Sequence, residues 1–213
     1  LQLLDLDRLL YSFRVQAGLP NAVRPYGGWE SPEYQWGLIN GHFTGHLLSA
    51  LAFAAAAGNP EMAAKGATLV TALRKCQLAF GAAHPSLAGW LSAYGIDHLE
   101  RLEDHNHTRV WAPLYTIHKI MAGLYDQHVQ TGNAEALTTL DAMANFLVAR
   151  ITALIADKGR AWWQACLDVE FGGMNEVAVS GQASNPRRRG TKGHGQHARR
   201  PPHFVSHTPA CAP

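Results

Sequence analysis

The chain of 213 residues is 47% hydrophobic and only 16% charged, which is typical of a globular domain, or part of one, with an apolar core. Its net charge of +2 is unevenly distributed, because all acidic residues lie at or before Glu176, whereas six basic residues follow it. The most apolar stretch, residues 47–57, contains Ser49 and is too short to span a bilayer, so we expect a soluble protein without a membrane partner.

The N-terminal segment, up to Gly18, carries apolar residues at helical spacing, and Asp5 and Asp7 lie near its start, where the helix dipole favours negative charge. Gly18 and Pro20 predict the end of this helix. The long irregular stretch 19–41 follows, in which Gly and Pro alternate with four large aromatic residues: Tyr26, Trp29, Tyr34 and Trp36. Such loops inside compact domains are more often binding loops than linkers.

Two pairs of helices joined by tight turns are expected next, over residues 42–57 and 60–80, and then 113–130 and 134–155. Gly58-Asn59-Pro60 forms the first turn and Thr131-Gly132-Asn133 the second, while residues 81–109 are expected to be irregular. Helical spacing places five residues on the apolar face of the second helix: Met62, Leu69, Val70, Leu73 and Leu78. Alternation of long loops with short turns predicts an all-α toroid of antiparallel helical hairpins.

Histidines supply most of the candidate chemistry. His42 and His46 share one helix face at the spacing of a zinc-binding helix, but Phe43-Thr44 stands where such a motif needs Glu, so substrate, metal and structural roles stay open. His118 lies near the start of a helix entered through an aromatic-rich segment, which is typical of a pocket floor. The alternative is a buried helix with one hydrogen-bonded histidine. The segment Asp104-His105-Asn106-His107 suits a metal but lies in a polar loop.

Four carboxylates lie in aromatic or glycine-rich settings: Glu30, Glu33, Glu170 and Glu176. Sugar chemistry uses paired carboxyls and aromatic stacking platforms, although each glutamate taken singly fits a structural role equally well. No nucleophile elbow is present. A phosphate-binding glycine loop is also absent, because no Lys-Ser or Lys-Thr follows Gly27-Gly28 or Gly172-Gly173.

Six separated motifs together resemble the catalytic domain of glycoside hydrolase family 127, the β-L-arabinofuranosidase-like proteins, over residues 3–177. In chain order they are Leu6-Asp-Arg-Leu-Leu-Tyr-Ser-Phe-Arg14, Ala17-Gly-Leu-Pro20, Tyr26-Gly-Gly-Trp-Glu30, Gly41-His-Phe-Thr-Gly-His-Leu-Leu-Ser-Ala-Leu-Ala52, Trp111-Ala-Pro-Leu-Tyr-Thr-Ile-His-Lys119 and Gly172-Gly-Met-Asn-Glu176. The resemblance implies an (α/α)6 barrel, of which this chain would supply about the N-terminal half. It also implies hydrolysis of terminal β-L-arabinofuranosides with retention.

The resemblance further implies a zinc-bound cysteine thiolate as nucleophile, assisted by a glutamate; coordination keeps such a thiol deprotonated at neutral pH. In the family these residues lie after the Gly-Gly-Met-Asn-Glu motif, whereas this chain leaves the family pattern after Val177. Cys76 and Cys166 are expected in the core, and Cys211 has no neighbouring Cys or Glu, so we assign no catalytic residue and no zinc ligand. The expected result is a truncated, inactive glycosidase-like chain with uncovered apolar hairpin faces.

The residues carried over from the family form a substrate-facing set: Trp29, Glu30, His42, His46, Trp111, Tyr115, His118, Asn175 and Glu176. The expected partner is a carbohydrate, namely a glycan containing L-arabinofuranose, with no nucleic acid and no membrane. The alternative is a non-catalytic carbohydrate-binding or helical scaffold module that kept the sugar-facing loops.

We expect residues 1–177 to form the partial catalytic domain and residues 178–213, rich in Pro, Arg and His, to be a disordered basic tail, because few aliphatic residues remain to offset its ordering entropy. An RNA-binding tail is one alternative. A gene-model artefact, such as intron read-through or a frame shift, is another. The localisation and the oligomeric state stay open.

Overall fold

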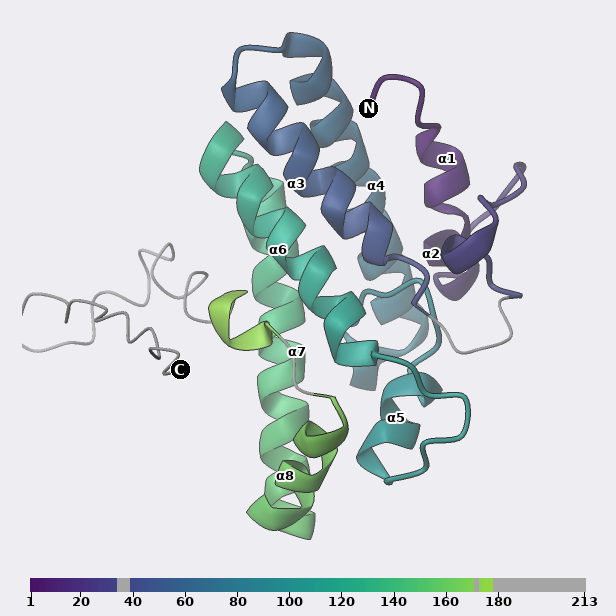
Figure 1. Cartoon of the computed structure of the whole chain (residues 1–213), viewed down its shortest axis with the longest axis vertical. Helices are drawn as coiled ribbons and strands as arrows, with labels where there is room; N and C mark the ends of the chain where they lie inside the picture. Colours follow the sequence, from purple (N-terminus) through teal and green to yellow (C-terminus); the bar gives the residue numbers. More distant parts are fainter. Residues whose placement is uncertain (34–38, 171–172, 178–213) are drawn as a thin grey trace, which may run out of the picture.

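A computed structural model of the chain describes residues 1–33, 39–170 and 173–177 (Figure 1). Within these ranges the chain is all-α, without a strand, which confirms the predicted fold class. The predicted tail, residues 178–213, and the loop aromatics Tyr34 and Trp36 lie outside the described residues.

The predicted N-terminal helix is two short helices, α1 (Leu6–Leu9) and α2 (Tyr11–Gln16). The interruption lies at Leu10, whose ψ of −6° departs from the helical value. The Asp5 side chain caps α1 by accepting the N–H groups of Asp7 and Arg8, so the acidic start has the role that the sequence predicts.

Both predicted hairpins are present, with ends that differ by at most a few residues. The first comprises α3 (His42–Ala56) and α4 (Pro60–Ala83), and the second comprises α6 (Pro113–Thr131) and α7 (Ala134–Lys158). The two turns use the same device, because Asn59 accepts the N–H of Met62 and Asn133 accepts the N–H of Ala136.

The helices α3 and α6 run side by side in the same direction, while α4 and α7 return along the outside (Figure 1). Glycines allow this close approach: a Cβ on Gly45 would lie 2.2 Å from the backbone of Lys119, and one on Gly123 would lie 2.5 Å from the Gly45 carbonyl. This packing is the one expected for consecutive hairpins of a toroid. It places the long loops and the starts of α3 and α6 at one end.

Two helices were not predicted, α5 (Asp97–Glu103) and α8 (Arg160–Val169). Two short 3-10 helices, η1 (Gly28–Glu30) and η2 (Pro85–Leu87), lie in the loops. Buried polar contacts join α5, α7 and α8: the Arg150 guanidinium donates to both oxygens of Glu103, at 2.7 and 3.0 Å, and the Trp162 indole donates to the Glu103 carbonyl at 2.7 Å. These contacts between distant segments make residues 81–109 more ordered than expected.

The core follows the predicted apolar face of α4 with one exception. Leu69, Val70 and Leu73 of α4 are buried, whereas Leu78 is 55% exposed and the neighbouring Gln77 is buried in its place. Gln77 is accommodated because its amide donates to the Gly89 and Thr139 carbonyls. The prediction that Cys76 and Cys166 are core residues is confirmed.

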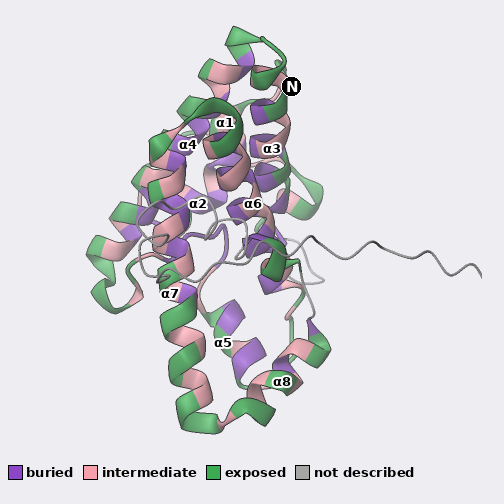
Figure 2. Ribbon diagram, turned by 90° about the vertical axis from the view of Figure 1, so that its left-hand side faces the viewer, coloured by how far each residue is buried: buried purple, intermediate pink, exposed green. Residues whose placement is uncertain are grey.

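Among the described helices, α7 is long and apolar enough to cross a membrane by length and composition alone, although the core helices of soluble proteins pass the same test. The expectation from the sequence, which rested on the apolar stretch at residues 47–57, did not include α7. Only 28% of its most apolar window is buried, and Val148 is 63% exposed. Figure 2 shows the exposed residues along the part of α7 near α5 and α8.

Candidate functional site

The starts of α3 and α6 bring predicted site residues together in an aromatic wall, which comprises Trp29, His42, His46, Trp111 and Tyr115. The Trp29 ring lies 5.9 Å from His42 and 6.1 Å, edge-on, from Trp111 between centroids. The His42 ring in turn lies 6.0 Å from His46 and 6.2 Å from Tyr115. Both tryptophans remain substantially exposed, so the wall faces solvent.

Glu30 holds both the first turn of α3 and the His42 ring. Its Oε2 accepts the N–H of Gly41 at 2.7 Å, and its Oε1 accepts the N–H of Phe43 at 3.1 Å. The His42 Nδ1 lies 3.2 Å from Glu30 Oε1 and 2.7 Å from the Ile39 carbonyl oxygen. Because both neighbours are acceptors, Nδ1 carries a proton, and the neutral ring leaves Nε2 as the acceptor.

The protonation of His42 follows from the same contacts. Burial by itself lowers the pKa of His42, but the hydrogen bonds to Glu30 and Ile39 and the charge of Glu30 together raise it above its ordinary value. His42 is therefore the histidine of this site that protonates most readily as the pH falls.

His46 and His118 have the opposite tendency. Burial, with the nearby Lys119 ammonium, lowers the pKa of both imidazoles. His118 is only 7% exposed, and its Nδ1 has no hydrogen-bond partner among the described residues. Gly173 packs directly on the ring, since a Cβ there would lie 2.5 Å from the His118 Cε1. Both histidines are therefore neutral at neutral pH.

Lys119, the last residue of the motif that begins at Trp111, belongs to the site although it was not among the predicted substrate-facing residues. Its ammonium lies 5.0 Å from the centre of the Tyr115 ring, and its charge acts on His42, His46 and His118. The i to i+4 spacing from Tyr115 is the signal that could have indicated it.

The polar surface continues along α6 to Asp126, which the sequence also did not indicate. Burial raises the pKa of the Asp126 carboxyl, a hydrogen bond from Ser49 of α3 lowers it, and the charge of Glu176 raises it further. Glu176 also acts on His118. Polar groups of α3 and α6 thus continue beyond the aromatic wall.

Glu170, weighed in the sequence as a possible sugar-chemistry carboxylate, binds the start of α6 instead. Its Oε2 accepts the N–H of Leu114 at 2.9 Å, and its Oε1 accepts the N–H of Tyr115 at 2.6 Å. Burial raises the pKa of Glu170, and the two N–H groups offset part of that shift.

The family comparison agrees with this geometry. The model of the family described as β-L-arabinofuranosidase, GH127 catalytic domain, matches residues 1–183. The chain belongs to this family. Membership indicates a glycoside hydrolase-like function and a carbohydrate substrate. A search of curated protein sequences finds no match.

The zinc and cysteine chemistry implied for a GH127 protein does not fit the described residues. No group of three His, Cys, Asp or Glu side chains in residues 1–33, 39–170 and 173–177 is arranged to hold a metal ion. Burial raises the pKa of the Cys76 thiol to about 11, and burial also raises the pKa of Cys166, so neither is a ready thiolate. Cys211 lies outside the described residues.

The metal-friendly loop at residues 104–107 has a structural role in this GH127 chain. The His105 ring stacks on Trp162 at 4.0 Å between centroids, and its Nε2 lies 3.1 Å from the Trp162 carbonyl oxygen. His105 therefore ties the loop to α8.

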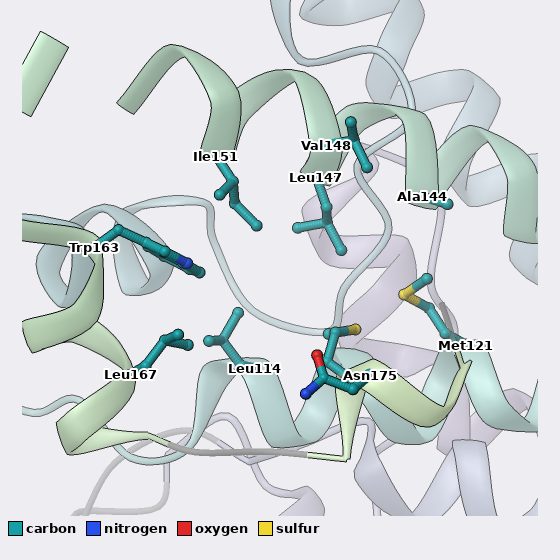
Figure 3. A pocket seen from close by; sticks show the side chains of 10 residues that line it. Leu114, Met121, Ala144, Leu147, Val148, Ile151, Trp163, Leu167 and Asn175 are labelled. Carbon is teal, nitrogen blue, oxygen red and sulfur yellow. The ribbon is translucent and has the colours of Figure 1, made fainter. Parts of the chain in front are cut away.

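Asn175 and Glu176 come from a helical turn at residues 174–177, which follows Gly173. Asn175 lines a mainly apolar cavity of about 260 Å³ between α6, α7 and α8, with Met121, Leu147 and Trp163 (Figure 3). Of the nine predicted substrate-facing residues, Asn175 alone lines this cavity. Glu176 acts electrostatically on His118.

Proposed function

We propose that the described residues form the substrate wall of a site that takes terminal β-L-arabinofuranosides. The observation that carries this proposal is the aromatic wall at the starts of α3 and α6, with Trp29 and Trp111 exposed beside His42. Aromatic faces suit the apolar faces of a sugar ring, and fixed polar groups suit its hydroxyls.

Each polar residue has a role in this proposal. His42 accepts a sugar hydroxyl through Nε2, because its Nδ1 is held by Glu30 and Ile39. The neutral His46 and His118 imidazoles offer further acceptors or donors. Glu176, on the turn at residues 174–177, acts on His118 through its charge, whereas Asn175 lines the apolar cavity. Glu30 acts through His42 and α3, since both of its oxygens already bind groups of the protein.

We further propose that these residues bind the sugar without cleaving its glycosidic bond. Retention of configuration needs a nucleophile on the protein, and the described cysteines are buried in the core with raised pKa values. The same observation favours the second candidate function, a non-catalytic carbohydrate-binding module.

Binding is tested by titrating the chain with methyl β-L-arabinofuranoside and measuring the binding by calorimetry or saturation-transfer NMR. Trp111→Ala and His118→Ala should each weaken binding roughly tenfold or more, because stacking and hydrogen bonding are lost. Phe53→Ala is the matched control, since Phe53 is an exposed aromatic at the other end of α3. Binding that survives both Trp111→Ala and His118→Ala would contradict the proposed site.

Turnover is tested by assaying L-arabinose release from the same glycoside, with and without added zinc. We expect binding without release. Clear zinc-dependent release by this chain would overturn the proposal that the bond-breaking groups are missing, and would exclude the non-catalytic alternative.

A further inference from the structure

The first turn of α6 has no cap of its own. Its N-cap residue, Ala112, adopts a left-handed conformation with φ 49° and ψ 51°, and it makes no side-chain capping hydrogen bond. Pro113 has no N–H, so the first donors that need partners are those of Leu114 and Tyr115. Glu170, which lies 55 residues beyond Tyr115 in the chain, accepts both.

The first turn of α3 is also held by a glutamate from another segment. Its N-cap residue, Gly41, is also left-handed, with φ 100°, and it also has no local side-chain cap. Glu30 arrives from η1 and accepts the N–H groups of Gly41 and Phe43. Both helices that carry the aromatic wall are therefore held by a glutamate from another segment, whereas α4 and α7 are capped by the residue that precedes them, Asn59 and Asn133.

We propose that Glu170 is a positioning residue for the sugar pocket: by holding the first turn of α6, it fixes Tyr115 and His118 relative to the turn at residues 174–177. The proposal rests on the proposed function only for the identity of the ligand. Glu170 does not touch the sugar and acts through α6.

Glu170 and Gly173, which lie close together in the chain, contact α6 about one turn apart. Glu170 binds the N–H groups at residues 114 and 115, and Gly173 packs against the ring of His118, with room for no Cβ. The turn that carries Asn175 and Glu176 follows directly. Loss of the Glu170 contact is therefore expected to displace the first turn of α6 and, with it, the ring of His118.

The charge of Glu170 is used for this contact. The residue is 9% exposed, and none of the ion pairs within residues 1–33, 39–170 and 173–177 includes it. Its carboxylate is stabilised by the donors and the dipole at the start of α6. A shortened or neutral side chain loses this double contact while leaving the aromatic wall chemically unchanged.

The test compares Glu170→Gln with Asn133→Ala in the full chain. The glutamine has one acceptor oxygen, and its NH2 group meets a backbone donor, so one hydrogen bond is lost. We expect roughly tenfold faster amide exchange at Leu114 and Tyr115, a shifted His118 ring signal, and roughly tenfold weaker binding of methyl β-L-arabinofuranoside. Asn133→Ala removes a cap at the far end of α7, so it should reduce stability while leaving sugar affinity and the His118 signal unchanged.

A Glu170→Gln chain that loses stability but keeps the wild-type affinity and the wild-type His118 signal would reduce Glu170 to a structural cap and overturn the proposal. If the wild-type chain binds no arabinofuranoside, the proposed function fails, but the His118 signal and the amide exchange still decide the positioning role. If Glu170→Gln does not fold, Glu170→Asp, which keeps the charge and reaches less far, should show the same changes to a smaller degree.

Discussion

His42 and His118 lie in the same site, but their pKa values are shifted in opposite directions. Glu30 and the Ile39 carbonyl hold the His42 Nδ1–H, whereas His118 is buried near the Lys119 ammonium. One imidazole can therefore be protonated while the other stays neutral. Between the two pKa values the site therefore has a charged donor beside a neutral hydrogen-bonding group, whereas above the pKa of His42 the Nε2 of His42 is an acceptor.

Titration of the imidazole signals by NMR should resolve this difference. The pKa of His42 should lie above the ordinary value of about 6.5, and those of His46 and His118 below it, with burial as the main cause for the latter two. Glu30→Gln should lower the pKa of His42 and leave that of His118 nearly unchanged. Indistinguishable titrations of His42 and His118 would contradict the described contacts.

The same shifts predict how stability depends on pH. Because the folded-state pKa of His118 is lowered, its contribution to stability is present above the unfolded pKa, about 6.5, and is lost as the pH falls through the folded value. Replacing His118 by Asn, which does not titrate, should make stability less sensitive to acid in this window. Urea unfolding at several pH values measures it, and an unchanged acid dependence would argue against a buried neutral His118.

At the scale of the elements, the sequence predicted the long helices and missed the short ones. The hairpins are predictable from their Gly-Asn turns and long apolar faces, because capping and periodicity are local properties of the sequence. The helix α5 is short and depends on contacts with distant segments, such as Glu103 with Arg150 and Trp162. Nothing within residues 81–109 alone contains that information. In contrast, α8 carries Trp163, Cys166 and Leu167 at helical spacing, a local signal that could have indicated it.

The candidate site shows the same division. The aromatic and histidine residues were found because their motifs resemble a family, and most of them do meet at the starts of α3 and α6. The contacts of Glu30 and Glu170 with those helix starts were not predictable, since each glutamate is placed by loop geometry rather than by spacing. Sequence patterns thus predicted which residues lie near one another but not the contacts that hold them.

Leu78 and Leu73 provide a direct test at this scale, since helical spacing placed both on the apolar face of α4. Leu73 is fully buried and Leu78 is 55% exposed. Leu73→Ala should cost about 2–5 kcal/mol of unfolding free energy, whereas Leu78→Ala should cost about 0.5 kcal/mol or less. Equal losses in urea unfolding would support the spacing and contradict the structure.

The parallel packing of α3 on α6 depends on Gly45. A Cβ at this position would lie 2.2 Å from the backbone of Lys119, which cannot move aside as a side chain can. Gly45→Ala should therefore cost about 1–3 kcal/mol or more, measured by chemical denaturation. Gly27→Ala is the matched control, because nothing lies within 4 Å of a Cβ there. Tolerance of Gly45→Ala would contradict the close helix pair.

At the scale of the whole molecule, the described residues leave an apolar surface uncovered. The cavity of about 260 Å³ between α6, α7 and α8 is lined by residues such as Leu147, Ile151 and Trp163, and Val148 at its edge is 63% exposed (Figure 3). Apolar surfaces of this kind favour association.

We therefore expect the chain to self-associate as its concentration rises, which sedimentation velocity measures. Val148→Glu should shift the population toward the monomer. Val129→Glu is the matched control, since Val129 is an exposed valine of α6 that does not line the cavity. Equal effects of the two substitutions, or a monomer at every concentration, would place the association surface elsewhere or exclude it.

The most direct test of the proposed substrate wall is an NMR titration of the ¹⁵N-labelled chain with methyl β-L-arabinofuranoside, followed through the tryptophan indole signals. We predict saturable shifts at Trp29, which lies beside His42, and at Trp111, which lies beside Trp29, while Trp90, Trp162 and Trp163 stay unmoved. Shifts confined to Trp163, which lines the apolar cavity, or no shifts at all, would contradict a sugar-binding wall at the starts of α3 and α6.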